Sequence, residues 1–115
     1  MTAPAYIPNA GDLIWTDVDP TLGREQAGRR PALVVSPAAF TENTGFAIVC
    51  PITSRVRPFL TSVVLPAGLP VVGEILTSHI RSVDTQARTV RYAGAAVARE
   101  TALLVRAKLD TVIAI

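Results

Sequence analysis

Short apolar runs separated by turn residues cover most of this chain, and they constrain its fold more than any other feature. The run from Ala32 to Val35 is followed by Ser36-Pro37, and the run from Phe46 to Cys50 is expected to end at Pro51. Runs of four or five apolar residues between turn residues are typical of buried strands. The sequence therefore predicts a mainly β protein.

Further short strands are expected on both sides of these two runs. Asp12 to Val18 begins the series and ends at Asp19-Pro20, and Thr21 to Arg29 is expected to be a long loop because it holds two glycines among polar residues. The remaining expected strands are Thr61 to Leu65, Glu74 to Leu76, Ile80 to Val83 and Thr89 to Tyr92.

Only the end of the chain has a helical period. From Ala98 to Ile113, apolar residues recur at helical spacing, and the expected stripe is Leu104, Val105, Leu109, Val112 and Ile113. One helical turn is also expected to start at Ser36-Pro37, because proline suits the first helical position, and to close at Thr44-Gly45. Short strands followed by one helix predict a small, strongly curved antiparallel sheet or half-open barrel.

Composition excludes a disordered chain and a membrane span. The 115 residues are 50% hydrophobic and 17% charged, with a mean hydropathy of +0.40, whereas disordered chains are charge-rich and apolar-poor. The longest uncharged run, Pro58 to Gly73, is broken by prolines and glycines and is shorter than the roughly 20 residues that a spanning helix needs. Residues 1–6 lack the basic start and apolar core of a signal peptide. We therefore expect one cytoplasmic domain whose surplus apolar surface forms an oligomer interface.

Metal and cofactor chemistry is not expected. The chain has one histidine, His79, and one cysteine, Cys50, so no common zinc-ligand spacing occurs. It also lacks a glycine-rich phosphate loop and a Gly-x-Ser-x-Gly elbow. Cys50 is expected to be a buried apolar side chain, and Trp15 is expected in the core or an interface rather than as a base-stacking platform.

Positive charge is concentrated in two segments. The net charge is only +2, and ten of the eleven cations are arginine. The excess lies in Arg24 to Arg30 and in Arg55-Val56-Arg57. If these segments meet, they form a site for an anionic ligand, because the guanidinium fork matches phosphate geometry. The alternative is that these arginines are solvated loop charges.

A long series of motifs runs in one register from about Asn9 to the end of the chain. Its parts are Gly11-Asp12-Leu13-Ile14-Trp15, Asp17-Val18-Asp19-Pro20-Thr21, Gly23, Glu25-Gln26, Gly28, Arg30-Pro31-Ala32-Leu33-Val34-Val35-Ser36-Pro37, Thr44-Gly45, Val49-Cys50-Pro51-Ile52-Thr53-Ser54, Ile80-Arg81-Ser82-Val83-Asp84 and Ala87-Arg88. This series resembles the MazF/PemK family of toxin endoribonucleases.

The resemblance implies a fold, an activity and partners. The fold is the small SH3-like half-open barrel of the MazF/PemK/CcdB toxin type, a homodimer, with residues 1–8 as an N-terminal tail and 9–115 as a single toxin domain. The activity is that of a type II toxin: sequence-specific cleavage of single-stranded mRNA, independent of ribosome and metal, through the 2′-hydroxyl. A cognate antitoxin inhibits such toxins, usually by laying an acidic segment across the RNA groove.

The resemblance also assigns site residues. The catalytic pair is Arg30, from the Arg-Pro pair, and Thr53, from the Pro-x-Thr motif. Arginine is a poor general base and threonine is not basic, so the acid and base candidates are the titratable residues Glu25 and His79. The residues expected to bind RNA are Arg24, Gln26, Arg29, Ser54, Arg55, Arg57 and His79.

Two places depart from the common family pattern. Many relatives carry an acidic residue and glutamine where this chain has Ser78-His79, and the turn after Thr53 differs and is shorter. His79 is therefore either a groove residue or a packing residue. Without the motifs, Thr53 would be an ordinary threonine at a strand end and Arg30 a structural ion-pair partner. Two other functions stay open: a non-enzymatic binding module of the same fold that acts on a protein target, and a catalytically weakened relative.

Overall fold

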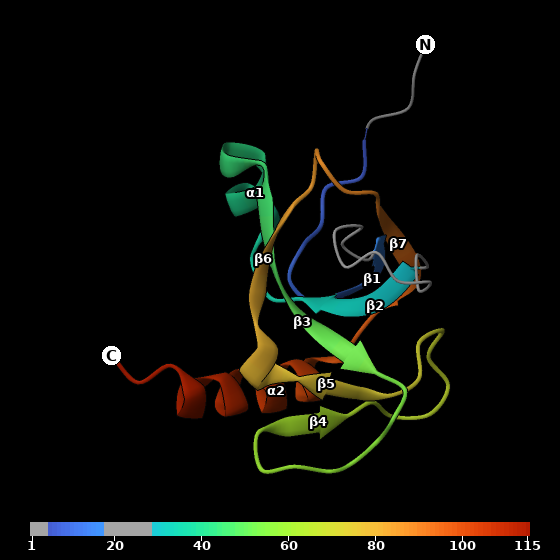
Figure 1. Ribbon diagram of the computed structural model, residues 1–115, viewed down its shortest axis with the longest axis vertical. Coiled ribbons are helices and arrows are strands. Elements are labelled where there is room, and N and C mark those ends of the chain that lie inside the picture. The colour runs from blue at the N-terminus through green and yellow to red at the C-terminus, as the bar shows by residue number, and fades with distance from the viewer. Residues whose placement is uncertain (1–4, 18–28) are drawn as a thin grey trace, which may run out of the picture.

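The strand β3 (Phe46–Thr53) is the centre of an antiparallel sheet (Figure 1). The computed structural model describes residues 5–17 and 29–115. The other strands are β1 (Asp12–Asp17), β2 (Arg29–Val34), β4 (Ser62–Val64), β5 (Glu74–Leu76), β6 (Arg81–Asp84) and β7 (Val90–Ala96). Their order is β4-β5-β3-β2-β1-β7, with β6 also paired to β3. Within the described residues the end strands β4 and β7 do not pair, so the curved sheet forms a half-open barrel, as the sequence predicts.

One edge of β3 is shared by two strands. β6 pairs with β3 as far as Val49, and β5 pairs from Ile52 onward. The N–H of Ile48 donates to Ser36 on the β2 side, so the nitrogen of Pro51, three residues on, faces the opposite edge because backbone groups alternate along a strand. Pro51 therefore lies where β3 changes partner, and its missing N–H removes no ladder bond there. The expectation that Pro51 ends the strand is wrong for this reason.

The central strands bury side chains on both faces. One cluster contains Leu13, Leu33, Cys50, Ile52, Val63, Leu65, Val71, Ile75, Val105 and Leu109. The other contains Ile14, Ala32, Val34, Ala47, Val49 and Val83. Neighbouring residues of β2 and β3 belong to different clusters, which explains why these strands appear in the sequence as continuous apolar runs. Burial raises the pKa of the Cys50 thiol to about 11, and the prediction of a buried apolar role for Cys50 is confirmed.

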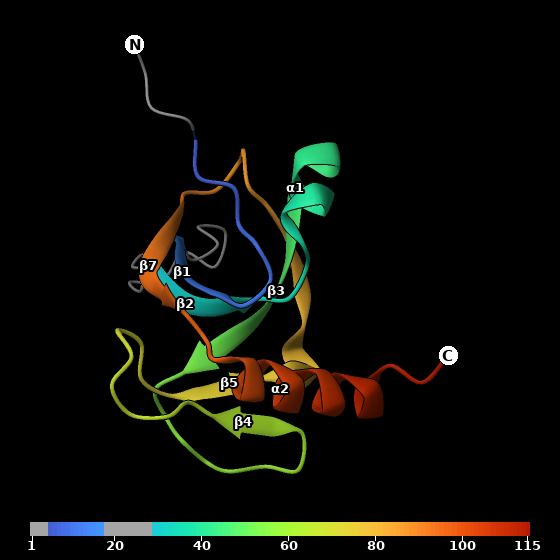
Figure 2. The same ribbon diagram turned by 180° about the vertical axis from the view of Figure 1, so that it is seen from behind.

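The helix α2 (Arg99–Val112) closes the first cluster by packing against β4 and the short helix η2 (Thr77–His79), as seen in Figure 2. Val105 and Leu109 are buried on the expected stripe. Leu104 and Ile113 are 54% and 51% exposed, so the predicted stripe was too wide. The buried residues of α2 are Thr101, Val105 and Leu109, which lie four residues apart in one narrow row.

Two boundaries differ from expectation at the start of the sheet. Pro37 is the extended residue before helix α1 (Ala38–Thr44) rather than its first helical residue, and Gly45 closes α1 with φ +80° as predicted. Arg29 and Arg30, expected in a loop, begin β2 and pair with Asp17 and Thr16 of β1. Pairing with a neighbouring strand outweighs the low strand preference of these polar residues. In the part of the chain that is described, no helix is long and apolar enough to cross a membrane.

Candidate active site

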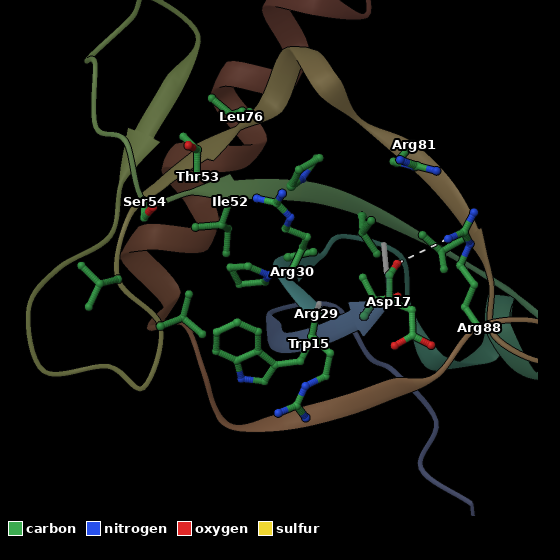
Figure 3. Close-up of a pocket in the computed structure, with 18 of the residues that line it drawn as sticks. Trp15, Asp17, Arg29, Arg30, Ile52, Thr53, Ser54, Leu76, Arg81 and Arg88 are labelled. Atoms are coloured by element: carbon green, nitrogen blue, oxygen red, sulfur yellow. Dashed lines mark hydrogen bonds between the residues drawn. The ribbon is translucent and has the colours of Figure 1, made fainter. Parts of the chain in front are cut away.

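A groove of about 630 Å³ opens where the second core cluster ends. Its walls come from β1, β2, β3, β6 and the segment before β5. Figure 3 shows Thr53 and Ser54 at one end, Arg81 and Arg88 at the other, and Arg30 between them. The described lining residues are Trp15, Thr16, Asp17, Arg29, Arg30, Pro31, Ala32, Val49, Pro51, Ile52, Thr53, Ser54, Pro70, Val71, Val72, Leu76, Arg81, Val83 and Arg88.

Strand register brings Arg30 and Thr53 together. Ala32 pairs with Pro51 in the β2–β3 ladder. Arg30 lies two residues before Ala32 on β2, and Thr53 lies two residues after Pro51 on β3. Side chains two residues apart on a strand share one face. The exposed Arg30 guanidinium and the Thr53 hydroxyl therefore face the same space in the groove.

The backbone of Thr53 is fixed by close packing. Thr53 pairs with Glu74 in the β3–β5 ladder, and the preceding Gly73 has φ +142°. A Cβ at position 73 would lie 2.2 Å from the Thr53 carbonyl oxygen, so only glycine allows this approach. The Thr53 Oγ1 accepts the N–H of Arg55 at 3.1 Å, which leaves its own proton free to be donated into the groove.

The next residue, Glu74, is a buried carboxylate with 1% exposure. The Ser62 hydroxyl donates to its Oε2, and the backbone N–H of Arg57 donates to its Oε1 at 2.9 Å. These bonds, together with the backbone N–H of Phe59, lower the pKa of Glu74 against the opposing effect of burial. The buried Glu74 carboxylate thus holds the segment that follows Thr53 by hydrogen bonds.

Among the described residues that line the groove, four are arginines: Arg29 and Arg30 from β2, Arg81 from β6 and Arg88 from the turn after it. Asp17 is the carboxylate among the described lining residues. Its Oδ2 accepts the N–H of Thr89 at 3.1 Å, and Arg88 donates to its main-chain carbonyl at 3.4 Å (Figure 3). The groove consequently carries an excess of positive charge from fork-shaped donors suited to phosphate oxygens.

The sequence-predicted site residues are distributed unevenly around this groove. Arg29, Arg30, Thr53 and Ser54 line it. Arg55 and Arg57 are exposed on the following segment, and His79 is exposed on η2; none of these three is among the lining residues. Arg24, Glu25 and Gln26 lie outside the described residues. Trp15 packs against the first core cluster, as predicted, and also lines the groove.

Sequence reasoning missed Arg81 and Arg88 as groove residues. Both stand within the family motifs, but the charge pattern pointed to residues 24–30 and 55–57 instead. Arg81 pairs with Val49 of β3, so the fold brings it to the groove from a distant part of the chain. The available signal was the two-residue period of a strand, which gives Arg81 and the apolar Val83 a common face.

The chain matches a family model described as PemK-like, MazF-like toxin of type II toxin–antitoxin systems over residues 9–113. The chain belongs to this toxin family. It is 40% identical to the endoribonuclease toxin MazF of Escherichia coli K12 over 108 residues, which cover 94% of this toxin and 96% of that protein. The endoribonuclease toxin ChpB of the same strain is 36% identical over 92 residues, covering 75% and 78% of the two chains.

Solved structures agree with this assignment. The crystal structure of MazF from Deinococcus radiodurans matches this toxin with a TM-score of 0.84 at 41% identity, over 96% of this chain and 100% of the other. A crystal structure of MazE–MazF from the same organism matches with a TM-score of 0.84 at 39% identity, over 96% and 99% of the two chains. The match confirms the predicted toxin fold, a mainly antiparallel sheet with a C-terminal helix.

Proposed function

We propose that this MazF-like toxin endoribonuclease cleaves single-stranded mRNA at a short sequence, without a ribosome or a metal ion, by attack of the 2′-hydroxyl. The observation that carries the proposal is that Arg30 of β2 and Thr53 of β3 line the same groove. The activity is assigned to one toxin domain, residues 9–115. Because the substrate is mRNA, the proposed place of action is the cytoplasm.

The reaction exchanges one phosphate ester bond for another. The 2′-hydroxyl loses its proton and its oxygen bonds to phosphorus, while the bond from phosphorus to the 5′-oxygen breaks. The products are a 2′,3′-cyclic phosphate on one fragment and, after proton uptake, a 5′-hydroxyl on the other. Such a reaction needs a base, an acid, and donors for the charge that grows on the phosphoryl oxygens.

Arg30 and Thr53 are suited to the last of these roles. Arg30 supplies a permanent positive charge and paired N–H donors to the phosphate. Thr53 donates its hydroxyl proton to the same phosphate or positions the 2′-hydroxyl, while its oxygen accepts the Arg55 N–H. The candidates for base and acid are Glu25 and His79, the titratable residues that the sequence offers. Arg29, with Arg24, Gln26, Ser54, Arg55 and Arg57, is proposed to bind the flanking RNA.

The proposed partners follow from the charge of the groove and from the relatives. An acidic antitoxin segment would satisfy the same arginine donors as the RNA backbone, and the Deinococcus radiodurans relative has been crystallised as MazE–MazF. The proposed assembly is a homodimer. The exposed apolar side chains of α2, Leu103 and Leu104, are part of the surplus apolar surface that an interface would bury.

The test is cleavage of a long RNA by purified protein in excess EDTA. We expect discrete fragments whose ends carry a 5′-hydroxyl and a cyclic phosphate, with the cleaved sequence read by mapping the ends. Arg30→Ala should slow the appearance of the fragments by about 10²–10³-fold, whereas Arg99→Ala, at an exposed position at the start of α2, should not. Intact RNA at micromolar protein would contradict the proposal. Toxicity in cells that survives Arg30→Ala would instead favour action on a protein target.

A further inference from the structure

The segment from Ser54 to Leu60 is exposed throughout, yet it follows Thr53 directly and carries Arg55 and Arg57. An exposed segment loses entropy when it is ordered, so it keeps one conformation only where other groups hold it. Two tethers act at its far end: Lys108 Nζ donates to the Leu60 carbonyl at 2.7 Å, and the Thr77 hydroxyl donates to the Thr61 carbonyl. The half next to Thr53 has a different tether.

That tether is the buried carboxylate of Glu74. It accepts the Arg57 N–H at 2.9 Å and the Ser62 hydroxyl, while the Phe59 N–H donates to the same Ser62 hydroxyl at 3.0 Å. All three donors belong to the stretch from residue 57 to residue 62. Burial of a carboxylate raises the free energy of the folded state unless its hydrogen bonds are made. Breaking the contact with this stretch would therefore leave the buried Glu74 charge without these hydrogen bonds.

Glu74 is also joined directly to the candidate active site. It pairs with Thr53 in the β3–β5 ladder and with Val64 on the β4 side. One residue therefore fixes both the strand end that bears Thr53 and the segment that bears the two exposed arginines.

We propose that Glu74 is a positioning residue that holds the segment Ser54 to Ser62 in the conformation in which Arg55 and Arg57 contact RNA phosphates beyond the Thr53 end of the groove. This inference rests on the proposed RNA cleavage. Glu74 itself touches no substrate, because it is buried beneath the segment.

Two substitutions separate the hydrogen bonds from the charge. In Glu74→Gln, the amide oxygen can accept the Arg57 N–H and the amide nitrogen can donate to Ser62 Oγ, whose proton then turns to the Phe59 carbonyl, 3.1 Å away. In Glu74→Leu, the Arg57 N–H has no acceptor. Glu74→Asp keeps the charge but withdraws it by one methylene, and it replaces Glu74→Leu if that variant does not fold.

The primary measurement is the salt dependence of binding to a 2′-O-methyl RNA oligonucleotide, which cannot be cleaved. The logarithm of the binding constant falls linearly with the logarithm of the salt concentration, and each phosphate contact on a single strand contributes about 0.7 to the steepness of that line. Losing two contacts therefore lowers the steepness by about 1.4. We expect this loss in Glu74→Leu and in the double variant Arg55→Ala/Arg57→Ala, and no further loss when the three substitutions are combined. Glu74→Gln should keep the wild-type slope. In cleavage assays, Glu74→Leu should raise KM with kcat little changed.

Losses that add up in the combined variant, or a wild-type slope in Glu74→Leu, would overturn the inference. Amide hydrogen exchange of the free protein tests the anchor without RNA: the Arg57 N–H should lose protection in Glu74→Leu and keep it in Glu74→Gln. If the wild-type protein neither binds nor cuts RNA, the proposed function fails. The exchange experiment still decides whether Glu74 holds the segment.

Discussion

Arg30 and Thr53 each lie two residues beyond the Ala32–Pro51 pair, which places their side chains on the face that Ala32 and Pro51 share. Neither residue belongs to a buried cluster, and both line the groove. This arrangement lets a positive fork and a hydroxyl act on one phosphate from two strands. It also means that the two side chains can be changed with little effect on core packing.

The first prediction concerns this pair. Arg30→Ala and Thr53→Ala should each lower kcat/KM by about 10²–10³-fold, the loss usual for one donor to a developing oxyanion. The melting temperature should stay close to wild type. The double variant should lose little more than either single variant, because both groups serve one phosphate. Thr53→Ser should keep most of the activity, and a fully additive double variant would show that the two groups act separately.

Arg81 extends the groove away from Thr53, and the second prediction uses it. Arg81→Ala should weaken binding of an uncleavable RNA and lower the salt slope by about 0.7, the value for one phosphate contact on a single strand. Arg99→Ala, on an exposed helix position outside the groove lining, is the matched control. An unchanged slope for Arg81→Ala would place the RNA path elsewhere.

Gly73 gives a prediction about the backbone. Gly73→Ala combines a φ of +142° with a Cβ placed 2.2 Å from the Thr53 carbonyl oxygen, and it should lower the free energy of unfolding by about 3 kcal/mol. Gly68→Ala has φ +97° but nothing within 4 Å of its Cβ, so only the strain of about 1 kcal/mol applies. Urea unfolding measures both. Equal losses would show that the contact with Thr53 is unimportant.

The lowered pKa of Glu74 predicts a pH dependence of stability. Because the folded state lowers this pKa from its ordinary value of about 4.5, the unfolded state takes up the proton more readily. The contribution of Glu74 to stability is therefore complete above that ordinary value and is lost as the pH falls through the folded-state pKa. Urea unfolding between pH 7 and pH 3 should show a steeper acid loss for wild type than for Glu74→Gln. Parallel curves would argue against the hydrogen bonds as its cause.

The last prediction separates the two candidates for the base. His79 is exposed on η2 and is not among the described residues that line the groove. His79→Gln should therefore keep the pH profile of kcat/KM, whereas Glu25→Gln should remove its acid limb. The reverse result would make His79 the base and require η2 to approach the substrate.

The sequence predicted most of the fold because burial on two faces leaves a clear pattern. The runs around Leu33 and Val49 were recognised as buried strands since every position in them is apolar. Arg29 and Arg30 are predicted in a loop because their own residue types do not show that they pair with Asp17 and Thr16 of β1. Pro51 is predicted to end its strand because a local rule cannot show that β3 changes partner there.

The candidate site was predictable in part. The family motifs named Arg30 and Thr53, but only the fold shows that they line one groove. Arg81 was missed because its place depends on the pairing of β6 with β3, from which two other strands separate it in the chain. Glu74 looked like an ordinary strand residue, since a carboxylate in a sequence gives no sign that three donors from another segment will surround it.

The division of the core into two clusters gives the molecule two levels of native-state fluctuation. Amide groups in the middle of β2 and β3 are screened from water on both faces, so they become accessible only when the whole molecule unfolds. Arg29 and Arg30 lie past the end of the second cluster and can open without exposing it. The groove end of the sheet can thus rearrange at a free energy below that of global unfolding.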